Sequence, residues 1–435
     1  MKMNLPALKV GENSRFLVNQ NGEPFFWLGD TAWELIHKLS LAETQLYFQN
    51  RIEKGFTIIQ TVILAELDGL TVPNANGDLP LKDLDPSQPN EAYFSHVDKI
   101  IELANEMGLY LALLPTWGDK FNKKWGTGPE VFTPENARAF GASLAKRYAK
   151  HQHIVWVLGG DRVPQDKEDE AIIEQMAMGI REFDKDSLIT YHPNGGVIAS
   201  DIFGKSTWLQ VDMFQSRHQK NFREYTFVNK ARNRQPVRPV INGEPGYENI
   251  PNLLNKWNFQ RLDAADVRLS AYWSMLSGAA GYTYGCNEVW QMNTAESTPL
   301  FGAHLSWQEA LDLPGARQMG ILRSIFESLP WQQMHATRQI FAGINWPFSP
   351  PKLALSTSDQ SCLLIYQSTG SKIKLKIKKG ILNNSAVYWI NPQNGRVTPT
   401  KAKGSNTFYS PNRLQDWLLL ILSNKQRDQW HYTSS

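Results

Sequence analysis

Two hydrophobic patterns alternate along the first three quarters of the chain. Short runs rich in Val, Ile, Leu and Thr predict buried strands, whereas apolar residues at every third or fourth position predict helices. The strand-like runs lie at residues 25–29, 57–64, 109–114, 154–158, 188–191, 209–214, 239–242 and 280–284. Helical spacing occurs at residues 41–54, 97–107, 134–150, 168–183, 221–233, 263–277 and 317–329. Eight strands that alternate with helices predict a closed, parallel (β/α)8 TIM barrel of the α/β class.

The pattern becomes purely β beyond residue 351. Residues 362–366, 373–377, 386–390 and 417–422 predict short strands separated by Gly, Asn and Pro turns. The run 373–378 alternates apolar residues with lysines, which predicts a strand with one buried and one solvated face. We therefore divide the chain into a barrel domain at residues 1–335 and a small antiparallel β-sandwich at residues 336–435, with a Pro- and Trp-rich junction at residues 330–351.

Composition narrows the classes of function. With 42% hydrophobic and 20% charged residues, the chain can bury a large core, so disorder is not expected. The formal net charge is +3 and no dense basic block is present, which disfavours a nucleic-acid partner. The longest strongly apolar run, residues 417–422, is far shorter than the roughly 20 residues of a membrane helix. Fifteen Trp and fourteen Tyr offer flat rings that suit sugar faces, although a large barrel also needs aromatic core residues.

The cysteines and the N-terminal residues indicate in which cellular compartment the protein is expected. Cys286 and Cys362 fall in different predicted domains, and we expect two free thiols. The opening residues, MKMNLPALKV, lack the long apolar segment of a signal peptide, so we expect a cytoplasmic protein. A chain that had lost a leader would look the same, which leaves a secreted or periplasmic location open.

Polar and aromatic residues follow the predicted strands, where barrel active sites lie. Asp161 follows the fourth strand and Glu244 the seventh, and these strand ends face each other across a barrel mouth. Glycoside hydrolysis needs two carboxyl groups that flank the scissile bond. A glycine precedes each residue, which allows a tight turn that brings the carboxylate forward. We therefore predict Asp161 as the general acid/base and Glu244 as the nucleophile.

Other chemistries fit less well. A single carboxylate after a strand could merely cap a helix, and Asp30 could either do this or contact substrate. His151 and His153 resemble a zinc pair but precede the fourth strand, at the wrong end of a barrel. The sequence has no GxSxG, Walker or GxGxxG motif in the required context. We expect no metal and no cofactor, and a carbohydrate-binding barrel without catalysis is the alternative.

Six segments together resemble the apiosidase-like glycoside hydrolases: residues 25–33 (FFWLGDTAW), 73–77 (PNANG), 115–119 (PTWGD), 156–161 (WVLGGD), 242–247 (NGEPGY) and 289–292 (VWQM). The resemblance spans about residues 8 to 330. It implies a barrel enzyme that acts on plant-wall glycans, and some members of the family remove apiose from pectin side chains. It also places the family's catalytic aspartate on Asp161 and its glutamate on Glu244. The tail around residues 388–395 resembles the β domain that usually follows this barrel, which often carries a collagen-binding label.

The combined prediction is a retaining, exo-acting glycoside hydrolase for plant cell-wall glycans of the pectin type. Its only expected partner is an oligosaccharide or glycan substrate. The residues that we expect to contact that substrate are Asp30, Trp33, Glu66, Trp117, His192, Gln215, His218, Tyr247, Tyr284 and Trp290.

Overall fold

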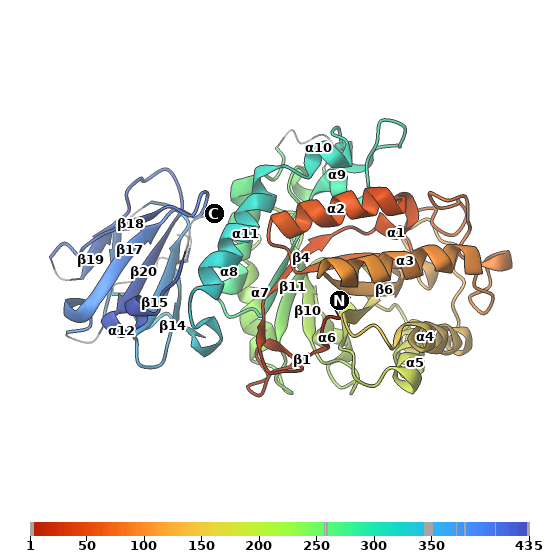
Figure 1. Ribbon diagram of the computed structural model, residues 1–435, viewed down its shortest axis with the longest axis horizontal. Helices are drawn as coiled ribbons and strands as arrows, with labels where there is room; N and C mark the ends of the chain where they lie inside the picture. Colours follow the sequence, from red (N-terminus) through yellow and green to blue (C-terminus); the bar gives the residue numbers. More distant parts are fainter. Residues whose placement is uncertain are drawn as a thin grey trace.

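The computed structural model describes residues 4–255, 257, 260–342, 351–370, 372–377, 380–404 and 406–432. A barrel of strands surrounded by helices forms the larger part, and a smaller β domain lies beside it (Figure 1). Among the described residues, none of the helices has the length and apolar character needed to cross a membrane.

One eight-stranded parallel sheet forms the barrel. Its strands are β4 (Trp27–Thr31), β5 (Ile58–Leu64), β6 (Tyr110–Thr116), β7 (Ile154–Gly159), β8 (Ile189–His192), β10 (Asp212–Gln215), β11 (Val240–Glu244) and β12 (Gly281–Tyr284). β12 pairs with β4, and the backbone N–H of Gln210 donates to the carbonyl of Ile189 at 3.1 Å, which joins β10 to β8. Each predicted strand overlaps one of these strands, so the predicted TIM barrel is confirmed.

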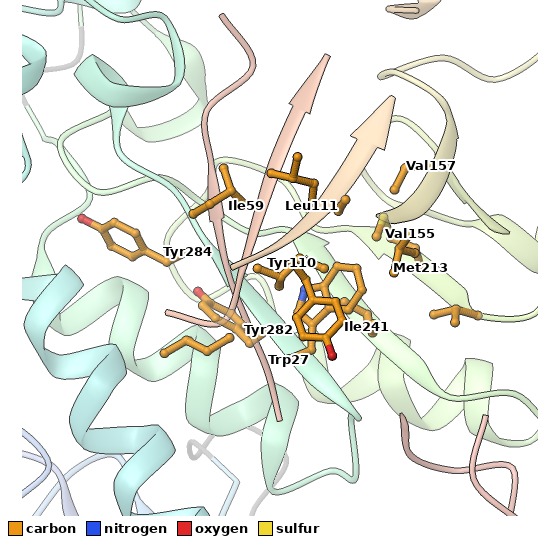
Figure 2. Packing of buried hydrophobic residues seen from close by; sticks show 14 of the residues in the cluster. Trp27, Ile59, Tyr110, Leu111, Val155, Val157, Met213, Ile241, Tyr282 and Tyr284 are labelled. Carbon is orange, nitrogen blue, oxygen red and sulfur yellow. The ribbon is translucent and has the colours of Figure 1, made fainter. Parts of the chain in front are cut away.

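Burial on both faces of the sheet explains its composition. Every residue of β5, β6 and β7 is buried, as expected where side chains fill the barrel and helices cover its outside. Hydrophobic side chains from several strands, among them Ile59, Leu111 and Val157, belong to one buried cluster (Figure 2).

Seven longer helices accompany these strands: α2 (Leu41–Glu53), α3 (Glu91–Met107), α4 (Pro134–Tyr148), α5 (Lys167–Phe183), α7 (Glu224–Arg232), α8 (Ala264–Met275) and α11 (Pro314–Glu327). Thr133 caps α4 by accepting the backbone N–H of Asn136, as a threonine before a helix-starting proline predicts. α3 begins earlier than predicted because Asn90 caps it there. It ends at Gly108, whose φ of +84° suits glycine.

Shorter elements fill the connections. The helices α1 (Leu35–Lys38), α6 (Ala199–Phe203), α9 (Asn287–Trp290) and α10 (Trp307–Ala310) lie in barrel loops, as does β9 (Val197–Ile198). A three-stranded antiparallel sheet of β1 (Leu8–Val10), β2 (Leu17–Asn19) and β3 (Pro24–Phe25) precedes the barrel. Single 3-10 turns occur at Lys82–Leu84, Gly118–Lys120, Asn252–Leu254, Leu300–Gly302, Trp331–Gln333 and Leu382–Asn384.

The tail is antiparallel β structure, as predicted. A six-stranded sheet contains β13 (His335–Ala336), β14 (Leu353–Ser356), β15 (Cys362–Gln367), β20 (Trp417–Ser423), β17 (Ser385–Ile390) and β18 (Val397–Pro399), and a two-stranded sheet contains β16 (Lys372–Lys374) and β19 (Thr407–Tyr409). A short helix, α12 (Asn424–Asp428), follows β20. Ile373 and Leu375 are buried while the lysines beside them are exposed, which confirms the one-sided strand; Lys378 lies outside the described residues. Residues 343–350 of the predicted junction also lie outside them.

The tail packs firmly on the barrel beside α8 and α11 (Figure 1). Arg268 of α8 donates from Nε and Nη2 to both carboxylate oxygens of Asp416, at 2.7 and 2.8 Å, and all these groups are buried. Tyr366 of β15 donates to the same carboxylate at 2.9 Å and stacks on Tyr272 of α8, with ring centroids 4.8 Å apart. One hydrophobic cluster includes residues of both parts, so they share a core.

Candidate active site

A cavity of about 740 Å³ lies where the barrel strands end. Of the residues predicted to form the site, it is lined by Trp33, Glu66, Trp117, Asp161, Gln215, His218, Glu244, Tyr247 and Trp290. These residues lie at the ends of seven different strands or in the loops that follow them, so the barrel brings together side chains that are far apart in the sequence.

Glu244, the last residue of β11, lies between two imidazoles. Nε2 of His192 is 3.0 Å from its Oε2, and Nε2 of His218 is 3.2 Å from its Oε1. The backbone N–H of Asp161 donates to Nδ1 of His192 at 3.3 Å, and that of Tyr247 donates to Nδ1 of His218 at 3.4 Å. Because Nδ1 accepts a hydrogen bond in both rings, a neutral ring carries its proton on Nε2, the atom that faces Glu244.

This environment keeps Glu244 ionised. Burial acts to raise the pKa of Glu244, but hydrogen bonds from His192 and His218 outweigh it and hold the pKa below its usual range. Tyr247 also contacts this carboxylate, and its hydroxyl accepts a hydrogen bond from Nε1 of Trp33 at 3.1 Å. Burial and the charge of Glu244 raise the pKa of Tyr247, so its hydroxyl stays protonated. A buried carboxylate with these neighbours can act as a nucleophile or as a base.

Asp161 sits on a tight turn directly after β7. Gly159 and Gly160 have φ of +94° and +102°, and Asp161 itself has φ of +56°, which is uncommon for a residue with a side chain. A Cβ on Gly160 would lie 2.7 Å from the backbone nitrogen of Gly118, so only glycine fits there. The side chain of Asp161 remains 25% exposed toward the cavity. Burial, and then the charge of Glu244, raise the pKa of Asp161 to about 6.

Arg162 holds this turn in place. Its guanidinium donates to the carbonyls of Asp161 (2.9 Å), Asn122 (2.7 Å) and Lys123 (3.1 Å), and its side chain is fully buried. The same guanidinium lies 4.4 Å from the ring centroid of Trp125, which lines the cavity. Arg162 therefore connects the loop after β6 to the turn that carries Asp161.

Further polar groups line the cavity. Burial, followed by the charge of Glu34 and other carboxylates, raises the pKa of Glu66, which favours a protonated carboxyl group there. Within the described part of the chain, three of these polar atoms are buried without a hydrogen-bond partner: Oε1 of Gln215, Oγ of Ser216 and Oδ1 of Asn194. Buried polar atoms are normally paired, so these atoms are available for the hydroxyl groups of a ligand.

Two predicted contacts are corrected by the structure. Oδ2 of Asp30 lies 2.6 Å from Nε of Arg51 and accepts a hydrogen bond from Tyr47 at 2.5 Å, away from the cavity. The hydroxyl of Tyr284 donates to Glu248 at 2.5 Å and is equally buried. Both residues are at strand ends, but strand side chains alternate in direction, and these two point toward the helices rather than into the barrel mouth.

His192 is the third predicted contact that the structure assigns differently. Its side chain is fully buried and does not line the cavity, because it packs behind Glu244. Trp33 and Trp117 cover the ring, with centroids 5.2 and 6.0 Å from its own. His192 therefore acts on Glu244 and not on a ligand.

The histidines and cysteines outside the cavity have structural surroundings. In the described ranges of the chain, no group of three or more His, Cys, Asp or Glu side chains is placed to hold a metal ion. Nε2 of His153 lies 3.0 Å from the carbonyl of Ile101, and His151 packs against it, so both serve the structure at the opposite end of β7. Cys286 and Cys362 are free and buried.

The residues at this site belong to a chain segment with known relatives. Residues 11–333 match the family model described as "Apiosidase-like, catalytic domain". The chain belongs to the apiosidase-like family. It is a glycoside hydrolase, as predicted. Residues 349–422 match a second model, described as "Putative collagen-binding domain of a collagenase". A search of the curated proteins finds no match.

Solved structures of glycoside hydrolases resemble the whole of this apiosidase-like chain. One, named "Glycoside hydrolase", superposes with a TM-score of 0.87 at 27% identity and covers 97% of each chain. A second, a family 5 glycoside hydrolase from Bacteroides vulgatus ATCC 8482, has a TM-score of 0.89 at 27% identity and covers 98% of this chain and 96% of its own. The similarity spans both the barrel and the tail, so these two structures share the two-part architecture of this chain.

Sequence reasoning missed several residues that line the cavity of this apiosidase-like enzyme: Asn194, Ser216, Trp125, Arg162, Leu253 and Phe301. Arg162 and Ser216 directly follow residues that were predicted, so the ends of the strands were a usable signal. Trp125, Leu253 and Phe301 lie in long loops, where no periodic pattern shows which side chains turn toward the cavity.

Proposed function

We propose that this glycoside hydrolase works by a retaining mechanism, with Asp161 as the general acid/base and Glu244 as the nucleophile. The observation that carries the proposal is a difference between two carboxyl groups that line one cavity. The pKa of Asp161 is raised to about 6, whereas that of Glu244 is lowered. One group is thus suited to donate a proton and the other to attack while ionised.

The steps follow from these protonation states. Glu244 attacks the anomeric carbon while Asp161 gives its proton to the glycosidic oxygen, so the leaving group departs as an alcohol and a glycosyl ester forms on Glu244. Asp161, now ionised, takes a proton from water as that water attacks the same carbon. The ester bond breaks, the sugar leaves with its original anomeric configuration, and both carboxyl groups return to their starting states.

We further propose an exo-acting enzyme for plant cell-wall glycans of the pectin type. The volume of the cavity, about 740 Å³, falls in the range of small-ligand pockets, roughly 300–1,000 Å³, which favours one terminal sugar and its neighbour over a long chain. The choice of plant-wall glycans is supported by membership in the apiosidase-like family alone.

A screen of plant-wall oligosaccharides, including apiose-bearing pectin fragments, tests the activity. Asp161→Ala and Glu244→Ala should each lower kcat by at least about a hundredfold, while Asp186→Ala, an exposed carboxylate on another surface, should not. NMR of the first product should show the anomeric configuration of the substrate. Near wild-type turnover in either variant would remove that residue from the mechanism, and an inverted product would overturn the nucleophile role of Glu244.

A further inference from the structure

The mouth of the cavity is apolar, in contrast to its polar floor. Among the described residues, four large hydrophobic side chains line the cavity and remain exposed: Trp125 (56%), Leu253 (58%), Leu254 (40%) and Phe301 (39%). Single exposed apolar residues are common on protein surfaces, but a group of them around one opening indicates a binding site.

The backbone at three of these positions is strained. Leu253, Leu254 and Phe301 have φ of +63°, +57° and +47°, values that bulky L-residues rarely adopt and that Gly or Asn would accept more easily. Folding therefore gains only partial burial from these side chains, and at the cost of an unfavourable backbone conformation. Strain that is retained at the entrance to a cavity points to a role in binding.

These side chains stand on opposite sides of the opening. Trp125 follows β6, whereas Leu253 and Leu254 follow β11, and these strands are four positions apart in an eight-stranded barrel. The guanidinium of Arg162, 4.4 Å from the ring centroid of Trp125, holds the indole plane in position. Phe301 comes from the loop after β12, next to β11 in the sheet. The four side chains define an apolar slot above the polar floor.

We propose that this apolar slot binds a phenol-type aromatic ring in the leaving group, so that the enzyme also cleaves aryl glycosides. The inference rests on the proposed function, because Asp161 would protonate the oxygen that joins ring and sugar. Sugar hydroxyls placed against leucine side chains would lose water without gaining partners. A flat aromatic ring loses only apolar hydration there and can stack on Trp125.

The binding test needs no knowledge of the sugar. 2-Naphthol is titrated calorimetrically into the wild-type protein and into the double variant Leu253→Asn/Phe301→Asn. Asn relieves the left-handed strain, so this variant should fold at least as well as the wild type. We expect binding by the wild type and a loss of about tenfold or more in the variant. Leu46→Asn replaces a leucine on α2 that is also about half exposed but lies away from the cavity, and this variant should bind as the wild type does.

The kinetic test uses the sugar released in the oligosaccharide screen. The double variant should raise KM for the 2-naphthyl glycoside of that sugar about tenfold and change KM for its methyl glycoside less than twofold. Three results would overturn the proposal. They are equal changes in KM for the two glycosides, no binding of 2-naphthol by the wild type, and binding of methyl glucoside that depends on the apolar slot. If the wild type binds 2-naphthol but hydrolyses no glycoside, the result would count against the proposed function and would still support the apolar slot as a binding site for aromatic rings.

Discussion

At the scale of single residues, two carboxyl groups of one site differ in the direction in which their pKa is shifted. Asp161 and Glu244 both carry carboxyl groups that are largely withdrawn from solvent, which by itself raises the pKa of either. The difference comes from their partners. Two imidazoles face Glu244, whereas Asp161 faces the cavity and the negative charge of Glu244. Hydrogen bonds to the charged form therefore decide which group is ionised at neutral pH.

This difference predicts the pH dependence of activity. In the proposed mechanism Asp161 must be protonated for the first step. Its pKa is about 6, so kcat/KM should fall about tenfold per pH unit as the pH rises above that value. Glu244 must be ionised and its pKa is lowered, so no loss on the acid side is expected until well below pH 4. The measurement is a pH profile of kcat/KM with a natural glycoside.

An activated substrate provides the control for that profile. A nitrophenyl glycoside needs little protonation of its leaving group, so Asp161→Ala should retain its first step and lose the fall near pH 6. A fall that persists in Asp161→Ala would show that another group titrates there.

At the scale of elements, the turn after β7 positions Asp161, the proposed general acid/base. It combines two glycines with positive φ and an aspartate in the left-handed region, and Gly160 also lies against the loop after β6. Backbone geometry of this kind costs stability and is kept where it positions a functional group.

Gly160→Ala should disable the enzyme. The new Cβ would meet the backbone nitrogen of Gly118 at 2.7 Å, so the turn must shift and carry Asp161 with it. A displacement near 1 Å can cost about a hundredfold in kcat. Gly22→Ala is the matched control, since Gly22 has φ of +83° but nothing within 4 Å of the added Cβ. It should lose only about 1–2 kcal/mol of stability, measured by urea unfolding, and keep its kcat.

The elements also show what the sequence could and could not predict. Strands and helices were predictable because burial imposes a period of about two or 3.6 on the chain. The position of Asp161 and Glu244 in the cavity was predictable because barrel active sites lie at strand ends. Asp30 and Tyr284 were misassigned because a strand end alone does not say which way a side chain points. Trp125 and Leu253 were out of reach because the conformation of a long loop depends on tertiary contacts.

At the scale of the whole molecule, the tail is part of the folded unit that supports the site. α8, which follows the loop after Glu244, is fixed to the tail by the buried pair of Arg268 and Asp416. The shared hydrophobic cluster makes separate unfolding of the two parts unfavourable. We therefore expect a single cooperative transition on denaturation.

Asp416→Asn tests this coupling. It leaves the charge of Arg268 buried and unpaired, which typically costs about 3–5 kcal/mol. Glu182→Gln breaks an exposed pair with Arg138 and should cost less than about 1 kcal/mol. Urea unfolding, followed by far-UV circular dichroism and by activity, measures both. An Asp416→Asn protein with wild-type stability, or with two separate transitions, would contradict the expected coupling.

The hydrogen bond from the backbone of Asp161 to His192 has one more consequence. The same imidazole faces Glu244, so a single ring joins the proposed proton donor to the proposed nucleophile, and a shift of the Asp161 peptide should move the ring against Glu244. Two substitutions that each disrupt this linkage should therefore have non-additive effects on turnover. The double variant His192→Ala/Gly160→Ala should have nearly the same kcat as the slower of the two single variants, because both substitutions disrupt the same contact.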